Sequence, residues 1–264
     1  MELQGAVCVV TGGGNGIGAA LARRFAAEGA AGVVVVDLDG TAAEAVAAGL
    51  GDRGLAVAGD VAREDLHQQV VASAEERFGP VDVYCSNAGT GAGAGLEASL
   101  EAWQTVWEVN TLAHVLAARA VLPSMLERGR GHLVQTASAA GLLTNLGDAA
   151  YTATKHAAVG LAEWIAVTYA HRGIRVSCLC PMGVDTDLLR RASEGVAGAV
   201  VTGAGVVLSP DVVAGHVVDA LSEERFLVLP HPEVAGFLQG KVADPDAWLA
   251  AMNRVQQRLE GSRG

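Results

Sequence analysis

The sequence predicts an α/β fold in which a doubly wound parallel sheet is covered by helices on both faces. Short apolar runs alternate with longer segments in which apolar residues recur every three or four positions, which is the order of strands and helices in such folds. Most runs are apolar throughout, as expected for parallel strands buried on both faces. With 264 residues, 51% of them hydrophobic, the chain is expected to form a single domain with a sizeable core.

Seven runs are predicted to be strands of one sheet, and right-handed crossovers between them give the doubly wound topology. In chain order they are Ala6–Val10, Val33–Val36, Leu55–Ala58, Val81–Cys85, His132–Thr136, Arg175–Cys180 and Phe226–Leu229. Ligands of such sheets bind beyond the carboxyl ends of the strands. We therefore expect the polar residues that follow these runs to meet in one cleft.

A glycine-rich turn, Thr11–Gly18, follows the first run and opens an amphipathic helix. Glycines let the backbone bend sharply and leave N–H groups open to a diphosphate at the amino end of the helix, where the helix dipole also favours negative charge. The dinucleotide-binding pattern is met only loosely, through Gly14-x-Gly16-x-x-Ala19. A tight turn without a ligand is the alternative.

The second run leads into Asp37, which lies 19 residues after Gly18, close to the spacing of a ribose-binding acid. A carboxylate there accepts hydrogen bonds from the ribose hydroxyls and repels a 2′-phosphate, and the glycine turn contains no arginine or lysine. The predicted cofactor is therefore NAD, not NADP. The alternative is that Asp37 only opens the polar turn that ends at Gly40.

Tyr151 and Lys155 are four positions apart, so on a helix both project from one face. A positive charge close to a phenol favours the phenolate and lowers the pKa of the tyrosine. The pair is therefore a candidate for proton transfer, although alone it is also typical of an exposed helix surface. Ser138, 13 residues before Tyr151 and just past a predicted strand, adds a hydroxyl donor.

Together these features resemble a short-chain dehydrogenase/reductase of the non-extended type, a family with a Rossmann fold. The resemblance covers about residues 4 to 190, and the order and spacing of its motifs are specific. The motifs are Thr11-Gly12-x-x-x-Gly16-Ile17-Gly18, Asn87-Ala88-Gly89, Asn110, Ser138, Tyr151 with Lys155, and Pro181-x-Gly183.

The resemblance implies hydride transfer between NAD and a secondary alcohol or ketone, with four catalytic residues. Tyr151 is the general base or acid, and Lys155 lowers the pKa of Tyr151 and binds the nicotinamide ribose. Ser138 donates to the substrate oxygen, and Asn110 holds a water that leads to the lysine. A turn cap is the alternative for Ser138, and a helix-bending polar residue is the alternative for Asn110.

The resemblance also implies further cofactor contacts. Asp60 is expected to contact the adenine amino group, with a helix N-cap as the alternative, and Asn87 is expected to be structural beside a backbone that lies along the cofactor. Besides Asp37, Tyr151 and Lys155, the expected cofactor-binding residues are Gly12, Asn15, Gly16, Ile17, Gly18, Asp60, Val61, Asn87, Ala88, Gly89, Pro181, Gly183, Val184 and Thr186.

Charge and cysteine use exclude several classes of protein. A formal charge of −11 argues against binding to nucleic acid or to an anionic membrane surface. The start Met1–Gln4 lacks the features of a signal peptide, and no apolar run approaches the roughly 20 residues that span a bilayer. The four cysteines lie in apolar runs and the seven histidines show no ligand spacing, so we expect no metal site and a cytoplasmic location.

The substrate is the least determined feature of the sequence. Residues 187–208 are expected to form a mobile lid, because they are rich in glycine and alanine and offer little side-chain packing. The loop Thr90–Gly95 opposite is equally short of polar groups. These walls favour an apolar secondary alcohol, such as a steroid-like, acyl or cyclic one, over a sugar phosphate.

The resemblance implies a homo-oligomer, either a dimer or a tetramer, in which the helices that carry Asn110 and Tyr151 pair between subunits. Leu161 and Trp164 are expected to join that contact. A final helix over Pro245–Leu259 places several large apolar residues on one side, which is more typical of packing than of ligand binding.

Two other functions remain open beside the dehydrogenase. A non-catalytic NAD-binding regulator would keep the glycine turn and Asp37 but has no use for the Tyr151 and Lys155 pair. A nucleotide-sugar epimerase or dehydratase uses a similar site, but its extended relatives carry a larger carboxyl-terminal domain. The 75 residues after Leu189 leave little room for one.

Overall fold

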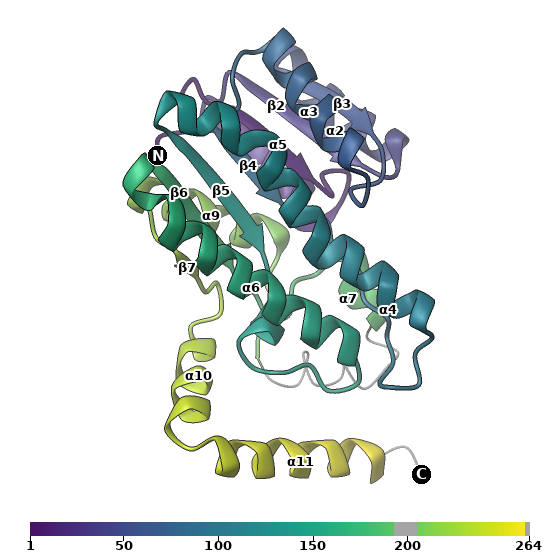
Figure 1. The fold of residues 1–264 in the computed structure, drawn as a ribbon. Helices are drawn as coiled ribbons and strands as arrows, with labels where there is room; N and C mark the ends of the chain where they lie inside the picture. The colour runs from purple at the N-terminus through teal and green to yellow at the C-terminus, as the bar shows by residue number, and fades with distance from the viewer. Residues whose placement is uncertain (193–204, 262–264) are drawn as a thin grey trace.

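The computed structural model describes residues 1–192 and 205–261, and it contains the predicted parallel sheet with helices on both faces (Figure 1). All seven strands are parallel in the order β3-β2-β1-β4-β5-β6-β7. They are β1 Val7–Thr11, β2 Gly32–Asp37, β3 Gly54–Ala58, β4 Val83–Ser86, β5 Gly131–Thr136, β6 Ile174–Leu179 and β7 Leu227–Val228. Each predicted run is a strand, with ends shifted by one or two residues.

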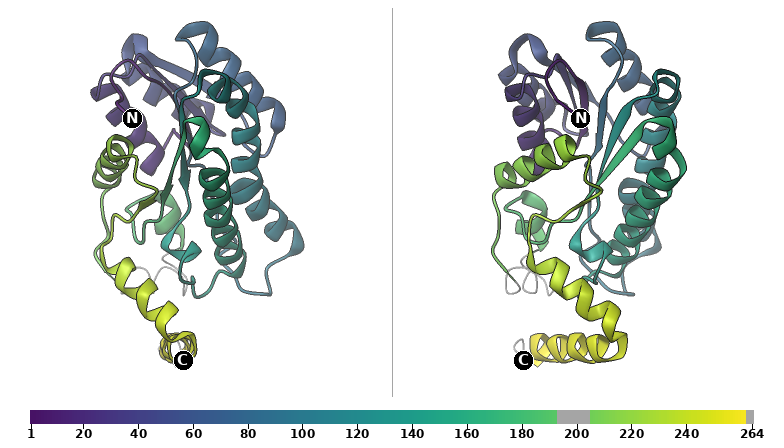
Figure 2. Two further views of the ribbon diagram at one scale, coloured as in Figure 1. Left: turned by 60° about the vertical axis from the view of Figure 1, so that its left-hand side comes forward. Right: turned by 90° about the vertical axis from the view of Figure 1, so that its left-hand side faces the viewer.

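Helices cover the sheet in two layers, with α1, α2 and α9 on one face and α3, α5 and α6 on the other. Figure 2 shows these layers from the side. The helices are α1 Gly16–Ala27, α2 Gly40–Gly49, α3 Glu64–Arg77, α4 Leu100–Trp107, α5 Ala113–Arg128, α6 Ala149–Tyr169, α7 Asp187–Ala192, α9 Pro210–Glu223, α10 Glu233–Ala243 and α11 Pro245–Gly261. A π-helical turn, Glu108–Leu112, joins α4 to α5.

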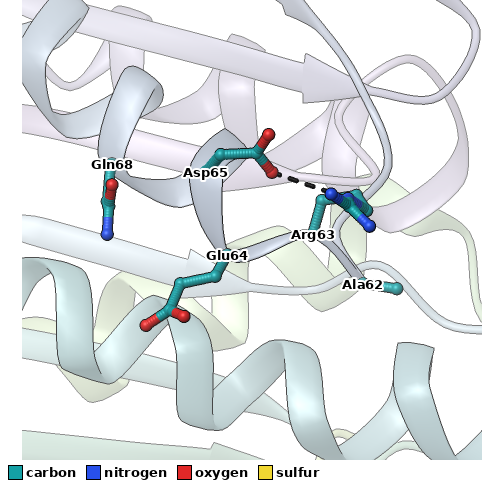
Figure 3. Close-up of a pocket in the computed structure, with 5 residues that line it drawn as sticks. All are labelled: Ala62, Arg63, Glu64, Asp65 and Gln68. Atoms are coloured by element: carbon teal, nitrogen blue, oxygen red, sulfur yellow. Dashed lines mark ion pairs between the residues drawn. The ribbon is translucent and has the colours of Figure 1, made fainter.

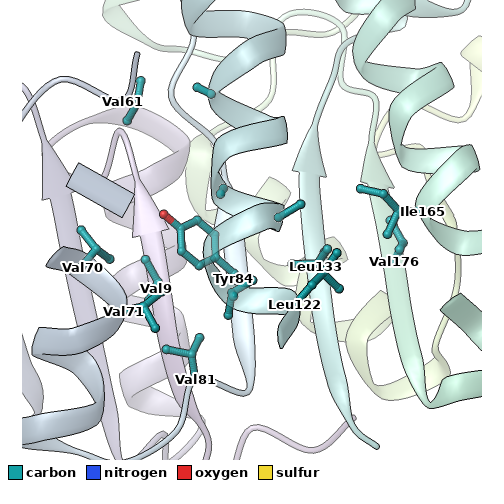
Figure 4. Packing of buried hydrophobic residues seen from close by; sticks show 14 of the residues in the cluster. Val9, Val61, Val70, Val71, Val81, Tyr84, Leu122, Leu133, Ile165 and Val176 are labelled. Atoms are coloured by element: carbon teal, nitrogen blue, oxygen red, sulfur yellow. The ribbon is translucent and has the colours of Figure 1, made fainter. Parts of the chain in front are cut away.

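Successive strand residues point into two separate cores, which is why the strands read as continuous apolar runs. On β1, Val9 faces the α3 and α5 layer whereas Cys8 and Val10 face the α1 layer. Figure 4 shows the first core, in which the side chains of Tyr84 and Leu133 from neighbouring strands are fully buried. Both layers are therefore needed to remove the sheet from water.

The four cysteines are free and buried, as expected for small apolar side chains in strands. Cys178 and Cys180 lie in the same core, with 3.7 Å between their sulfur atoms. This agrees with the prediction that they alternate onto one face of β6.

One helical stretch differs from expectation, because Leu100–Arg128 is long and apolar enough, by length and composition, to cross a membrane. Its most apolar part contains at most two charged residues, and half of that part is buried in this structure. There α5 packs on α3, β4 and β5. The stretch is thus part of the core.

A helical hairpin, α10 and α11, lies beyond the carboxyl end of the sheet (Figures 1 and 2). The predicted final helix is present, but no residue of α11 is buried, and Leu249 is 58% exposed. Of the expected lid, α7 occupies the first residues and Leu208 pairs with Val184. Residues 193–204 lie outside the described residues.

The core of the α1 layer depends on Leu21, whose side chain is fully buried. Replacing it with alanine leaves a cavity, so we expect Leu21→Ala to lower the free energy of unfolding by about 2–5 kcal/mol. Leu38→Ala is the matched control, since that side chain is 77% exposed, and its effect should stay within about 0.5 kcal/mol. Urea unfolding measures both, and equal effects would contradict the assigned packing.

Candidate active site

The glycine turn lies at the carboxyl end of β1, and its backbone leaves no room for side chains. Gly12 and Gly16 have positive φ angles of 62° and 50°, which glycine adopts without strain. A Cβ atom on Gly18 would lie 2.0 Å from the carbonyl oxygen of Gly12, and one on Gly14 would lie 3.0 Å from Asp37 Oδ2. The turn is therefore a bare backbone surface.

The amino end of α1, at this turn, has no capping side chain. Asn15 is the N-cap residue but makes no side-chain hydrogen bond, and the first turn of α1 contains no acidic residue. The next helix differs, because Asp39 caps α2. Free N–H groups and the helix dipole favour an anionic group, so this end, with Ile17 in its first turn, fits the diphosphate of a dinucleotide.

Asp37 lies at the end of β2 and is half-buried. Its Oδ2 accepts a hydrogen bond from the Gly14 N–H at 2.9 Å, and its Oδ1 accepts one from the Asp39 N–H at 3.0 Å. Asp37 therefore opens the polar turn, as the alternative stated, and also places a carboxylate beside the glycine turn.

Asn87-Ala88-Gly89 follows β4 and is tied to the end of β1. The Thr11 hydroxyl accepts hydrogen bonds from the Asn87 and Ala88 N–H groups at 2.9 and 3.1 Å, while Asn87 Nδ2 donates to the Thr11 carbonyl at 3.0 Å. These bonds agree with a structural role for Asn87. A Cβ atom on Gly89 would lie 3.4 Å from Lys155 Nζ, so this loop borders the next part of the site.

Tyr151 and Lys155 lie on α6 beside the end of β5, and the lysine is not on the surface. Lys155 is 2% exposed, its Nζ donates to the Thr136 carbonyl at 2.9 Å, and it lies 5.5 Å from the centre of the Tyr151 ring. Burial lowers the pKa of Lys155 to about 8. The alternative of an ordinary exposed pair is therefore wrong.

The pKa of Tyr151 differs in direction from the prediction. Burial raises it to about 12, while hydrogen bonding with Ser138 opposes that rise and the charge of Asp148 adds to it. In the protein alone, desolvation of the phenolate thus outweighs the attraction that was expected from Lys155. The phenol is neutral near pH 7 and is available as a proton donor.

Ser138 caps a turn, as its alternative role stated, and it also lies close to Tyr151. Its Oγ accepts from the Ala140 N–H at 3.1 Å, which caps the short 3-10 turn Ala139–Gly141, and it donates to the Pro181 carbonyl at 3.4 Å. The hydrogen bond with Tyr151 that opposes the rise in the phenol pKa links Ser138 to the phenol. The hydroxyl is therefore both a cap and a neighbour of the phenol.

Asn110 lies in the π-helical turn and is fully buried. Its side-chain amide forms hydrogen bonds with Thr90 and Thr154. Its Nδ2 donates to the Thr90 carbonyl at 2.8 Å and to Thr154 Oγ1 at 3.2 Å, and its Oδ1 accepts from the Thr90 N–H at 2.9 Å. Asn110 therefore fixes the loop after β4 against α6. π-helical turns occur often at functional sites.

The segment after β3 contains Asp60 and Val61. Asp60 is exposed, and its Oδ1 accepts from the Ala62 N–H at 2.9 Å. The N-cap alternative is wrong, because Arg63 occupies the N-cap position of α3. Val61 is buried, and its carbonyl accepts from His67 Nε2 at 2.8 Å.

A surface pocket lies next to this segment at the start of α3 (Figure 3). Its lining is polar, and Arg63 and Asp65 form an ion pair in it at 3.6 Å. None of the predicted site residues lines the pocket, whose residues are Ala62, Arg63, Glu64, Asp65 and Gln68. It is separate from the site formed by Ser138, Tyr151 and Lys155.

The loop after β6 reaches the glycine turn. A Cβ atom on Gly16 would lie 2.9 Å from the Thr186 methyl group, and Thr186 Oγ1 accepts from the Leu189 N–H at 3.3 Å at the start of α7. The Pro181 carbonyl accepts from the Ala139 N–H at 2.8 Å, and Val184 is buried. This loop thus joins the Ser138 turn to the dinucleotide turn.

Sequence reasoning missed two residues that hold the site together. Asp148 caps α6, with Oδ1 accepting from the Tyr151 N–H at 2.9 Å and Oδ2 from the Gly93 N–H at 2.8 Å. An aspartate three positions before Tyr151 is an N-cap pattern that predicts this role. His231 had no such local signal.

His231 is buried behind the loop that follows β6. Its Nδ1 accepts from the Met182 N–H at 3.1 Å, and its Nε2 donates to the Gly183 carbonyl at 3.1 Å. These two bonds fix the backbone on both sides of Met182 from a segment about 50 residues later in the chain. His231 therefore supports the loop without being one of the predicted site residues.

The chain matches a protein-family model and several characterised proteins. The family model described as short chain dehydrogenase matches residues 6–197. The 1-deoxy-11-beta-hydroxypentalenate dehydrogenase of Streptomyces exfoliatus is 40% identical over 240 residues, covering 88% of this chain and 86% of that protein. The cis-1,2-dihydrobenzene-1,2-diol dehydrogenase of Pseudomonas putida is 37% identical over 190 residues, covering 70% of this chain and 68% of that protein.

Solved structures give the same result. A short-chain dehydrogenase/reductase from Burkholderia phymatum, solved in complex with NAD, superposes with a TM-score of 0.85 at 30% identity and covers 94% of this chain and 96% of its own. The family model covers well over half of the sequence. The chain therefore belongs to the short-chain dehydrogenase family and is an oxidoreductase.

Proposed function

We propose that this enzyme oxidises a secondary alcohol to a ketone by transferring a hydride from the carbinol carbon to NAD, and catalyses the reverse reaction. The observation that carries the proposal is the buried Lys155 ammonium beside the half-buried Tyr151 phenol, next to Ser138 and the glycine turn. The similar proteins support it, because they are named as dehydrogenases of hydroxyl-bearing compounds. The Burkholderia structure supports NAD as the cofactor.

The residues at the carboxyl end of the sheet fit NAD. The uncapped start of α1 would hold the diphosphate, and Asp37 would accept from the ribose hydroxyls. Asp60, Val61 and the Asn87–Gly89 loop would flank the adenosine half. The nicotinamide carboxamide would be held by the loop after β6, through Pro181, Gly183, Val184 and Thr186. Lys155 would bind the nicotinamide ribose. When bound, NAD supplies the acceptor for the hydride.

The chain itself handles the proton. In alcohol oxidation the O–H bond of the substrate breaks, its proton passes to the Tyr151 phenolate, and the C–H electron pair leaves as hydride, so a C=O bond forms. Ser138 Oγ donates to the substrate oxygen and stabilises its developing charge. In the reverse direction the neutral phenol donates its proton to the ketone oxygen.

The phenolate form must overcome the effect of burial. The Ser138 hydroxyl and the Lys155 ammonium both favour the phenolate by hydrogen bonding or charge, and Asp148 opposes it. Because Lys155 keeps its proton below about pH 8, the positive charge is present at neutral pH. We assign Asn110 to holding the loop after β4 and a water that leads to Lys155.

The substrate is proposed to be an apolar secondary alcohol, such as a cyclic or steroid-like one. Leu142 and Leu143 are half-buried on the segment between Ser138 and Tyr151, and the loop Thr90–Gly95 offers no charged side chain. Residues 187–208 are proposed to close over the substrate as a lid within a single domain.

We further propose a homo-oligomer in the cytoplasm. Trp164 on α6 is 57% exposed, and Trp107 and Leu112 on the neighbouring helical stretch are 43% and 39% exposed. A second subunit would cover these side chains. Four free, buried thiols suit a reducing compartment.

Tyr151→Phe removes the proton acceptor and donor while keeping the ring. We expect kcat for a secondary alcohol to fall by about 10²- to 10⁴-fold, with the Kd for NAD changed by less than about threefold. Tyr169→Phe is the matched control at the far end of the same helix and should keep full activity. Turnover by Tyr151→Phe at the wild-type rate would show that another group moves the proton.

Asp37→Ser removes the carboxylate that would repel a 2′-phosphate. We expect the ratio of NADP to NAD affinity to rise at least about tenfold, measured by titrating both cofactors against protein fluorescence. Asp39→Ser is the control, because it also loses one negative charge on this turn and serine can still cap α2. An unchanged ratio in Asp37→Ser, or an equal rise in both variants, would refute the ribose role.

A further inference from the structure

The carboxyl-terminal hairpin is attached to the segment that joins Ser138 to Tyr151 through one side chain, Lys241. Lys241 lies near the end of α10, and its Nζ donates to the carbonyl oxygens of Leu142 and Leu143 at 2.8 and 3.0 Å. The same ammonium lies 5.1 Å from the centre of the Trp248 ring on α11. One side chain therefore contacts both helices of the hairpin and a segment almost 100 residues earlier in the chain.

The chemistry at this position suits lysine. The sequence contains sixteen arginines and two lysines, and the two lysines are Lys155 and Lys241. A compact ammonium with three donors can bond two successive carbonyl oxygens and still lie over a ring, whereas a planar guanidinium spreads its donors in a fixed fork. The Lys241 side chain is half-buried, and this partial burial lowers the pKa of Lys241.

The segment that Lys241 bonds lies between two parts of the site. It follows the turn capped by Ser138 and precedes α6, which carries Tyr151. Its far end is fixed from within α6, because Thr152 Oγ1 accepts from the Asn145 N–H at 2.9 Å. Lys241 adds two bonds to the near end from outside, beside the bonds that the Leu142 and Leu143 N–H groups donate to the Ala139 carbonyl at 3.0 and 2.8 Å.

Among the residues that the structure describes, the hairpin packs against few other elements of the protein. Val234 at the start of α10 is fully buried and anchors that end, whereas α11 packs against α10 and has no buried residue of its own. Figures 1 and 2 show both helices beyond the carboxyl end of the sheet. Lys241 is thus the polar connection between this hairpin and the Ser138 segment.

We propose that Lys241 is a positioning residue for substrate, and that by holding the Leu142 and Leu143 carbonyls it places the Leu143 side chain as an apolar wall against which the body of a bulky secondary alcohol binds, while Leu142 packs against the core. The inference rests on the proposed function, since Ser138 and Tyr151 must hold the reacting carbinol. It extends that function by assigning selectivity for large alcohols to the hairpin.

The test compares two alcohols of different size, 2-decalol and 2-butanol, with NAD. Lys241→Met keeps the length of the side chain but removes the donors. We expect it to lower the ratio of kcat/KM for 2-decalol to that for 2-butanol by about tenfold, mainly by raising the KM for 2-decalol. Lys241→Arg, which keeps donors and charge, should recover part of the ratio.

Arg254→Met is the matched control, because it removes one positive charge from an exposed position on α11 and should leave both kcat/KM values unchanged. A second readout needs no substrate. Hydrogen exchange of the amides in residues 142–148 should become faster in Lys241→Met than in wild type and Arg254→Met. If Lys241→Met does not fold, Trp248→Leu supplies the same comparison.

The outcomes separate this inference from the function on which it rests. If wild type oxidises the alcohols and Lys241→Met leaves both the ratio and the exchange rates unchanged, the inference is wrong and the proposed function stands. An equal loss for both alcohols through kcat would also overturn it. If wild type oxidises neither alcohol although NAD binds, the proposed function fails together with the substrate role, whereas the exchange measurement still tests the attachment itself.

Discussion

A buried ammonium at the end of β5 is the constraint on which the rest of this site depends. Lys155 is almost fully withdrawn from water, and the Thr136 carbonyl is the partner that holds its Nζ. Burying a cation is costly unless it is hydrogen-bonded, and the lowered pKa of Lys155 reflects that cost. Burial of the His114 ring, together with the charge of Lys155, lowers the pKa of His114 to about 3, so His114 is neutral at pH 7. Lys155 therefore supplies the positive charge beside the phenol.

The surrounding elements hold the Lys155 ammonium and the Tyr151 phenol in fixed positions relative to each other. Asp148 fixes the start of α6, and with it Tyr151, while also holding the loop after β4. Asn110 ties that same loop to α6 from a π-helical turn. Lys241 bonds the segment between Ser138 and Tyr151. Each of these residues is a polar side chain that bonds backbone atoms from a different element, so the helices and loops around the phenol are tied to one another.

The sheet could be predicted because a strand that is buried on both faces is apolar throughout. The location of the site could be predicted because polar residues follow those apolar runs. The sequence did not predict His231 or Lys241, because each acts on backbone atoms far away in the chain and neither has a local pattern. The pKa of Tyr151 was predicted in the wrong direction, since spacing on a helix shows which charge is near but not how far the phenol is removed from water.

The proposed role of the half-buried Tyr151 phenol and the buried Lys155 ammonium is hydride transfer to NAD. It is tested most directly by incubating the protein with NAD and a panel of secondary alcohols that ranges from small to bicyclic, while following the absorbance of reduced nicotinamide. We predict a rise with at least one apolar cyclic alcohol and no rise with NADP at the same concentration. Absence of turnover across the panel, with NAD binding demonstrated on the same sample, would contradict the claim and favour a non-catalytic NAD-binding regulator.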